Sequence, residues 1–453
     1  MLTDFIELKE QKTGSKTYLR ILKLINLGYM KYVVYLFLFA LLNTPAFAQS
    51  GSKADAALAR AGLCHLQKDY LKAIQWYEVA FKISPPDALS AYKAAGVYSL
   101  AGNAEKAEYY LKLALQKGWA ESLWLMEDPY FDNLKHADLL RWSRLVAQAV
   151  KNELEYEKKL GNPGLRRKIN LMVVSDQQLR YRKAQTQDPK ELEKINQELT
   201  ASDQKNWSEA KNIVEAYGWP KLSDIGKDGQ NNLWLIVQHA DHDVAFQRKV
   251  LEKMKLLIKS KQVNLENYAF LSDRVLCNLN YLQEFGTQVQ WTTNGMASGF
   301  RDIRREWEVD KRRKRLGLPG LTDYALTYGF TYEKPSEQDC RRVRKQILQK
   351  VKSLIDTAQT AYEGGDFQRT YDNYNAASTF AEGMSDDQSL KAAMLFSMIA
   401  AKVKDNQKYR DISFDFLNLL NLRNRLDKTS LKQMHEFEAI HQDTRWLMLV
   451  ETK

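Results

Sequence analysis

Two stretches of the sequence decide the expected fold: residues 61–80, AGLCHLQKDYLKAIQWYEVA, and residues 95–114, AGVYSLAGNAEKAEYYLKLA. They are 34 positions apart, and both carry Ala at their first, thirteenth and twentieth positions and Asp or Asn at their ninth. Small residues let two paired helices approach closely, and larger ones fill the groove between neighbouring pairs. A fixed period of this length predicts stacked helical hairpins.

This pattern resembles tetratricopeptide repeats, which implies helical arms of the kind that bind protein or peptide partners. Residues 49–150 are expected to form such an arm with its cap, and residues 336–453 a second one. The C-terminal arm keeps the same spacing at Ala358, Ala361, Asp366-Phe367, Tyr374 and Ala377, with Thr370 where a small Ala is usual. The alternative is that so few repeats only brace the region between them.

Both arms end in similar aromatic segments. The first closes with Phe131 followed by Arg141-Trp142, and the second with Phe437 followed by Arg445-Trp446. The separation of Phe and Trp differs by two residues, so the match is partial. We interpret both segments as caps over the apolar face of the last repeat, as helical solenoids require.

Residues 30–48, MKYVVYLFLFALLNTPAFA, have the layout of a signal peptide cut before Gln49. Lys31 precedes an apolar run that is shorter than the ~20 residues needed to span a membrane. The mature chain is therefore expected not to be transmembrane, but exported to a bacterial periplasm or secreted. Residues 1–29 are interpreted as an upstream extension, with translation starting at Met30; a genuine N-terminal anchor is the alternative.

Charge and cysteine content narrow the class of protein. The net charge of +11 is interpreted as solubility or contact with anionic envelope surfaces, and no nucleic-acid partner is expected. The three cysteines, Cys64, Cys277 and Cys340, are odd in number and far apart, which argues against a disulfide framework or a metal cluster. We expect no cofactor.

Residues 165–330 differ from the two arms in their pattern of polar and apolar residues, and they are expected to form a central, mainly helical domain. The predicted helices are 171–183, 207–217 ended by Gly218, and 231–260, with a charged stretch at 185–206 between the first two. Gln288–Trp291 and Met296–Ile303 alternate polar and apolar residues around Asn294-Gly295, which predicts a β-hairpin. The basic run 301–315 is interpreted as a solvated helix whose arginines pair with nearby carboxylates, or as a site for an acidic partner.

Polar residues interrupt the apolar pattern of the central region. In a single helix over 231–260, His239 and Asp243 share one face and Gln247 lies in the core stripe. Buried polar groups need hydrogen-bond partners, so these segments are expected to converge in one interior cluster. The candidate catalytic residues are His239, Asp241 and Asp273. The candidate ligand-binding residues are Gln238, Gln247, Arg274, Gln288, Asp176 and Arg180.

The order of these landmarks resembles a bacterial domain family of unknown function. They are Asp176-Gln177 with Arg180, Gly218-Trp219-Pro220, Gly226, Gln238-His239-Ala240-Asp241, Phe246-Gln247, Asp273-Arg274-Val275, Gly286-Thr287-Gln288, Val309-Asp310-Lys311-Arg312-Arg313 and Leu316-Gly317-Leu318. Phe285 stands where the family usually has Tyr. The resemblance implies a mainly helical domain with a polar interior and carries over no activity.

Three functions follow as hypotheses. The first is an exported interaction or scaffold protein with repeat arms around the central module. The second is a hydrolase-like enzyme that uses His239 with Asp241 or Asp273, as a general base or as metal ligands. The third is a polar-ligand receptor without turnover. Because the sequence contains no HExxH, GxSxG, P-loop or CxxC motif, no metal site is assigned and catalysis stays undecided.

Overall fold

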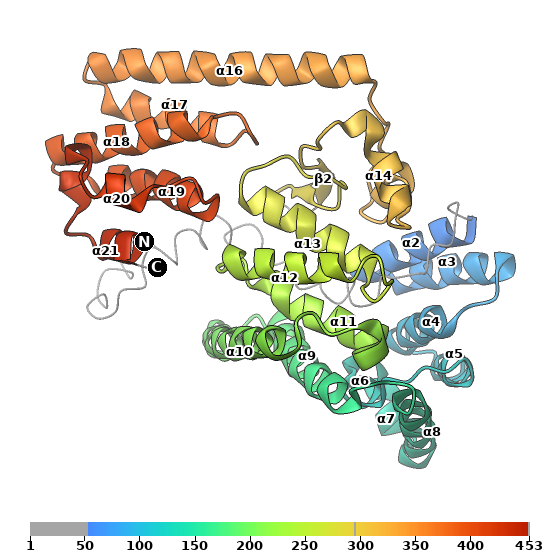
Figure 1. The fold of residues 1–453 in the computed structure, drawn as a ribbon. Helices are drawn as coiled ribbons and strands as arrows, with labels where there is room; N and C mark the ends of the chain where they lie inside the picture. The colour runs from blue at the N-terminus through green and yellow to red at the C-terminus, as the bar shows by residue number, and fades with distance from the viewer. Residues whose placement is uncertain (1–52, 294–295, 452–453) are drawn as a thin grey trace. The chain divides into compact units, whose positions relative to one another are not determined.

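The computed structural model describes residues 53–293 and 296–451 (Figure 1). As expected from the sequence, the described chain is mainly α-helical with one small antiparallel hairpin. It forms two compact units. The first contains the described residues up to Asn278 together with Leu282–Cys340, and the second contains Leu279–Tyr281 and the described residues from Arg341 onward. The predicted signal peptide, its upstream extension and the Asn294-Gly295 turn lie outside the described residues.

The first unit begins with two helical hairpins, α2 (Lys53–Leu66) with α3 (Tyr70–Ile83) and α4 (Ala88–Leu100) with α5 (Ala104–Gln116). The two hairpins turn in the same way. Lys68 and Gly102 adopt positive φ angles of 60° and 78°. The next residue, Asp69 or Asn103, then accepts a hydrogen bond from the third residue of the following helix. These side chains satisfy N–H groups that have no partner within the helix.

Three short elements and one long helix close this N-terminal region: α6 (Ser122–Glu127), η1 (Pro129–Phe131), α7 (Asp132–Ala137) and α8 (Leu139–Glu157). Aromatic residues of these elements and of the loop before α6 complete the core of the second hairpin. Trp119 stacks on Tyr92 with ring centroids 4.0 Å apart, and Phe131 lies 5.9 Å from Trp142. The buried Phe131 therefore belongs to the core of this region.

Five helices follow: α9 (Pro163–Gln185), α10 (Pro189–Tyr217), α11 (Leu222–His239), α12 (Val244–Leu256) and α13 (Leu265–Asn278). Gly218 ends α10 with a positive φ of 67°, as predicted. Two helix predictions were wrong. The charged stretch 185–206 is largely the first half of α10, because Asp188 and Pro189 start a helix there. The expected helix 231–260 breaks at Ala240, and Asp243 starts α12 by capping the Phe246 N–H.

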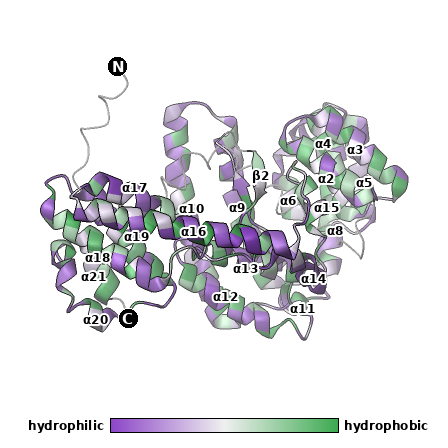
Figure 2. Cartoon of the chain, turned by 90° about the horizontal axis from the view of Figure 1, so that it is seen from above, coloured by the Kyte–Doolittle hydropathy of each residue, from purple (hydrophilic) through white to green (hydrophobic). Residues whose placement is uncertain are grey.

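The predicted hairpin is present as β1 (Val289–Trp291) and β2 (Ala297–Phe300), paired antiparallel with Val289 opposite Phe300. The short helices η2 (Glu306–Glu308), α14 (Val309–Arg315) and α15 (Leu321–Leu326) follow. α14 carries only the second half of the basic run 301–315 and is coloured hydrophilic in Figure 2, so the expected helix does not extend over residues 301–308. Its Arg313 is nevertheless buried, because its guanidinium donates to the carbonyls of Pro319 and Phe285.

A buried ion cluster joins α8, α9 and α11 within the first unit. The Arg166 guanidinium is 0% exposed and contacts Asp228, Glu153 and Glu157. Its Nη2 also donates to the carbonyl of Ala120 at 3.1 Å. These four charged residues are called the Arg166 cluster below. Beside it, burial and the negative charge of Asp228 raise the pKa of Glu121 to about 8.

The second unit is built from α16 (Glu337–Glu363), α17 (Phe367–Ser378), α18 (Asp386–Lys402), α19 (Gln407–Leu422), α20 (Lys428–Leu431), η3 (His435–Ile440) and α21 (Thr444–Glu451). The turn between α16 and α17 repeats the geometry of the N-terminal hairpins: Gly365 has φ 77° and Asp366 caps the Arg369 N–H. Phe437 and Trp446 lie 5.5 Å apart in its core. Among the described helices of both units, none has the length and apolar character needed to cross a membrane.

Candidate functional site

A partly buried polar cluster lies where α9, α10 and the end of α11 meet. The Arg180 guanidinium on α9 donates from Nε and Nη2 to both oxygens of Asp176, at 2.9 Å each. The same Nη2 donates to Oδ1 of Asp203 on α10 at 2.7 Å and lies 3.2 Å from Nδ1 of His239. One nitrogen thus contacts three acceptors from three helices. We call Asp176, Arg180, Asp203 and His239 the Arg180 cluster.

The electrostatics of this cluster fix the state of its histidine. Burial, and then the positive charges of Arg180 and Arg274, hold the pKa of His239 well below its usual value. The imidazole is therefore neutral at physiological pH. Because Arg180 can only donate, Nδ1 of His239 must accept and its proton sits on Nε2. Burial raises the pKa of Asp203 to about 6, against the opposing pull of Arg180.

A second group of polar residues follows the break after α11. Asp241 forms a bidentate ion pair with Arg274 on α13 and accepts a hydrogen bond from Asn278 at 2.9 Å. Gln247 is buried, and its Nε2 donates to the Val237 carbonyl at 3.1 Å and to Asp241 at 3.3 Å. Burial would raise the pKa of Asp241, but the charge of Arg274 and the hydrogen bonds from Arg274, Asn278 and Gln247 together lower it. We call Asp241, Gln247, Arg274 and Asn278 the Arg274 cluster.

Asp273 has a different role from its neighbour Arg274. Its buried carboxylate accepts backbone N–H bonds from Glu284, Phe285 and Thr287, and a bond from the Thr287 hydroxyl at 3.0 Å. Burial raises its pKa to about 6 although these donors act in the opposite direction. Asp273 therefore holds the 284–287 loop in place. Gln288 lies beside it and donates to Thr287 Oγ1 at 3.1 Å.

The expected single cluster is thus divided among neighbouring groups. His239 lies with Asp176 and Arg180; Asp241 lies with Gln247 and Arg274. Asp273 and Gln288 belong to the loop that follows α13. Gln238 is buried at the end of α11, and its amide nitrogen has no hydrogen-bond partner within the described structure. Asp243 does not join His239, since it caps α12 and accepts from Trp207 and Lys211.

Comparison with known proteins supports the coarse interpretation of this region. Residues 163–333 match the model of a family described as a family of unknown function, DUF6624. The chain contains a DUF6624 domain. Neither the curated proteins nor the solved structures yield a match to the chain. The three polar groups described above all lie within this domain.

One residue of the DUF6624 domain site was missed by the sequence analysis. Asp203 lies in the stretch 185–206, which the sequence analysis described only as charged. In the observed α10 it falls between Leu199 and Asn206, both of which belong to the buried stripe of that helix. Its spacing of four and three residues from these buried positions places it beside the stripe, where its side chain stays 44% exposed. An acidic residue at that spacing is the signal that identifies it. With Asp203 included, the structure brings together three side chains that could hold a metal ion: Asp176, Asp203 and His239.

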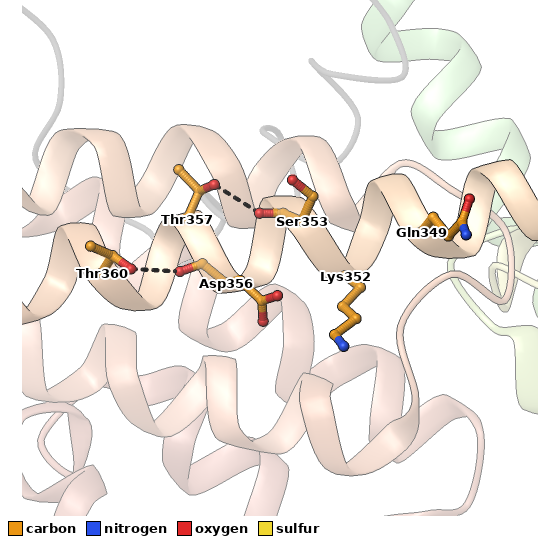
Figure 3. Close-up of a pocket in the computed structure, with 6 residues that line it drawn as sticks. All are labelled: Gln349, Lys352, Ser353, Asp356, Thr357 and Thr360. Atoms are coloured by element: carbon orange, nitrogen blue, oxygen red, sulfur yellow. Dashed lines mark hydrogen bonds between the residues drawn. The ribbon is translucent and has the colours of Figure 1, made fainter.

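The structure also has an open depression on the outer face of α16, outside the DUF6624 domain (Figure 3). It is lined by Gln349, Lys352, Ser353, Asp356, Thr357 and Thr360. All six residues come from this one helix, and the hydroxyls of Thr357 and Thr360 already donate to backbone carbonyls of α16. The depression is therefore ordinary helix surface and adds no chemistry to the site.

Proposed function

We propose that this chain is an exported interaction protein whose helical-repeat arms bind a protein or peptide partner around the DUF6624 domain. The observation that carries the proposal is the recurrence of one hairpin design in three places. A residue with positive φ is followed by an Asp or Asn cap at 68–69, 102–103 and 365–366. Repeated turn chemistry of this kind favours a repeated unit over an accidental helix pair.

Burial at the repeat positions supports the same proposal. The small residues Ala61 and Ala73 in the first hairpin are fully buried, as are their counterparts Ala95 and Ala107 in the second. In the C-terminal hairpin Ala358 and Thr370 are buried, and the Thr370 hydroxyl donates to the Asp366 carbonyl at 2.9 Å. Internal hydrogen bonding explains how Thr replaces Ala at a packed position without leaving a polar group unsatisfied.

An exposed apolar row on α3 is the surface that we assign to the partner. Leu71, Val79 and Ile83 recur at multiples of four residues, and Leu71 is 71% exposed. Residues four apart lie on one side of a helix, so these side chains form an apolar row, interrupted by Gln75 between Leu71 and Val79. An apolar stripe that remains accessible is typical of a surface that buries itself against a second protein.

Site-specific photocrosslinking tests this assignment. A photoreactive amino acid is placed at Leu71 or Val79 in the full chain, expressed in its native host, with exposed Glu193 on α10 as the control position. We expect one discrete adduct at the α3 positions. The crosslinked protein, once identified and purified, should bind the unmodified chain, and Val79→Asp should weaken that binding at least tenfold. Equal labelling at Glu193, or undiminished binding by the Val79 variant, would reject the proposal.

Export is part of the same proposal and has its own test. If residues 30–48 act as a signal peptide, the mature protein begins at Gln49. Mass spectrometry of the protein recovered from its host should find that N-terminus. Recovery of intact chains that start at Met1 would contradict it.

The hydrolase-like alternative receives less support. A general base and its orienting acid must lie within hydrogen-bond reach of each other. The carboxylate of Asp273 instead accepts hydrogen bonds from the 284–287 loop, and Asp241 is paired with Arg274. The accessible polar groups of the Arg180 cluster favour ligand binding as the second candidate function.

A further inference from the structure

We propose that Asp176, Asp203 and His239 form a binding site for one divalent transition-metal ion, which Arg180 occupies as a resident cation when no metal is bound. Each of the three residues offers one ligand atom, and these atoms all lie within 4.8 Å of one another. Two carboxylates and an imidazole suit Zn²⁺ or Mn²⁺ and leave coordination positions for water. The site is independent of the proposed repeat arms.

The position of Arg180 is the first argument. Its Nη2 lies 2.9 Å from Asp176 Oδ1, 2.7 Å from Asp203 Oδ1 and 3.2 Å from His239 Nδ1. A single positively charged nitrogen therefore stands at the point that a metal ion would share among the same three atoms. Metal bonds of about 2.0–2.2 Å require each of these ligands to move inward by roughly 0.5–1.2 Å.

The charge balance is the second argument. Two carboxylates face one guanidinium, and Nδ1 of His239 lies 3.2 Å from the same guanidinium nitrogen. With both carboxylates ionised, the cluster keeps one negative charge that Arg180 does not neutralise. A divalent ion in place of the guanidinium neutralises both carboxylates, and neutral imidazole with deprotonated carboxylates is the form that binds metals.

Gln177 provides an independent observation. Its side chain is buried, with 4% exposed, and its Nε2 donates to Asp176 Oδ2 at 2.8 Å. Hydrogen bonds of this kind orient carboxylates that ligate metals. The Oε1 of Gln177 accepts no hydrogen bond from any described residue. Water bound to a metal ion is a strong donor, and it would supply the partner that this buried acceptor lacks.

Access to solvent makes the exchange feasible. The Asp203 side chain is 44% exposed and that of Arg180 is 14% exposed. An ion can therefore reach the ligands from the Asp203 side while the guanidinium moves outward. Because the apparent affinity scales with the fraction of protein whose site is open, Arg180 weakens metal binding in the wild type.

Titration calorimetry of the metal-free full chain with Zn²⁺ and with Mn²⁺ tests the proposal. Arg180→Gln removes the resident cation and should bind one equivalent at least tenfold more tightly than the wild type. Asp203→Asn, alone or combined with Arg180→Gln, should weaken that binding at least tenfold. His242→Ala is the matched control, because His242 is an exposed imidazole three positions from His239, and it should bind metal like the wild type.

The result that overturns the proposal is also specific. It fails if neither the wild type nor Arg180→Gln binds one equivalent, if Arg180→Gln binds no more tightly than the wild type, or if Asp203→Asn leaves the affinity unchanged. Circular dichroism checks that each variant is folded. Should Arg180→Gln not fold, the comparison of the wild type with Asp203→Asn and His242→Ala decides alone: only a loss confined to Asp203→Asn supports the site.

Discussion

Replacing Arg166 by Met should destabilise the first unit more than any conservative surface change. The guanidinium is fully buried and contacts three carboxylates, from Glu153, Glu157 and Asp228, at 2.6 to 3.1 Å. Met keeps much of the side-chain volume but removes the buried positive charge that all three carboxylates contact. Removing one partner of a buried ionic network leaves the others uncompensated, and that penalty exceeds the lost attraction.

The expected magnitude follows from this burial. Breaking a buried ion pair by deleting one partner costs about 3–5 kcal/mol. A large domain loses roughly 2 °C of melting temperature per kcal/mol, so the transition of the first unit should fall by roughly 6–10 °C. The neighbouring Arg167→Met is the matched control. Its side chain is 61% exposed and reaches Glu157 only at 3.5 Å, and an exposed pair contributes about 0–1 kcal/mol.

Tryptophan fluorescence is the appropriate assay, because every tryptophan except Trp446 lies in the first unit. Thermal and urea unfolding followed in this way report on that unit. Asp228→Asn in the Arg166→Met background should recover part of the lost stability, since it removes one uncompensated charge. The reasoning is refuted if Arg166→Met melts no lower than Arg167→Met, or if the double variant is less stable than Arg166→Met alone.

Three further predictions concern the same unit. Gly226→Ala should lower the free energy of unfolding by at least about 2 kcal/mol, because φ is +72° and the new Cβ would lie 2.1 Å from the Tyr156 hydroxyl. Gly102→Ala, at φ +78° in open space, should lower it by only about 1 kcal/mol. Equal melting temperatures of the two variants would contradict this. Asp273→Asn should destabilise the unit by about 2–3 kcal/mol and make the 284–287 loop sensitive to limited proteolysis, whereas unchanged cleavage would argue against its loop-holding role. Glu121 has a pKa of about 8 in the folded chain against 4.5 ordinarily, so between these values the folded chain keeps a proton that the unfolded chain loses, and stability falls as the pH rises. Glu121→Gln should reduce the pH dependence of the urea midpoint between pH 5 and 8. An unchanged pH dependence would exclude Glu121 as its source.

The parts of the fold that depend on local chemistry could be predicted from the sequence. Gly218 ends α10 because glycine adopts the positive φ with which its N–H donates to the Val214 carbonyl at the helix end. That preference for glycine is visible in the sequence alone. The same holds for the alternation in Gln288–Trp291, which forms β1 of the observed hairpin. The buried polar cluster could also be anticipated, since polar residues stand among apolar ones in the DUF6624 domain.

The hydrogen-bond partners of these polar residues could not be assigned from the sequence, because they depend on where the helices end. An uninterrupted helix over 231–260 would place His239 and Asp243 on one face. In the structure Asp243 caps a new helix instead, and the intervening turn directs Asp241 toward Arg274. Asp203 was missed for a related reason. A stretch rich in Lys, Glu and Gln does not reveal which of its charges lies on the buried side until the start of the helix is known.

Two arginines on α9 show why similar charge patterns need not have similar roles. Arg166 is completely buried, and its carboxylate partners are themselves at most 14% exposed. Its guanidinium has no exposed surface and links α9 to carboxylates of α8 and α11. Arg180 is also held by carboxylates, but Asp203 faces solvent and a neutral imidazole completes the set. A cation such as Arg180, which has access to water and an uncharged imidazole among its partners, can be exchanged for another cation. A cation such as Arg166, which is enclosed on every side, can only stabilise the fold. The stability expected from Arg166 and the metal binding inferred beside Arg180 therefore follow from a single physical distinction, the access of each site to solvent.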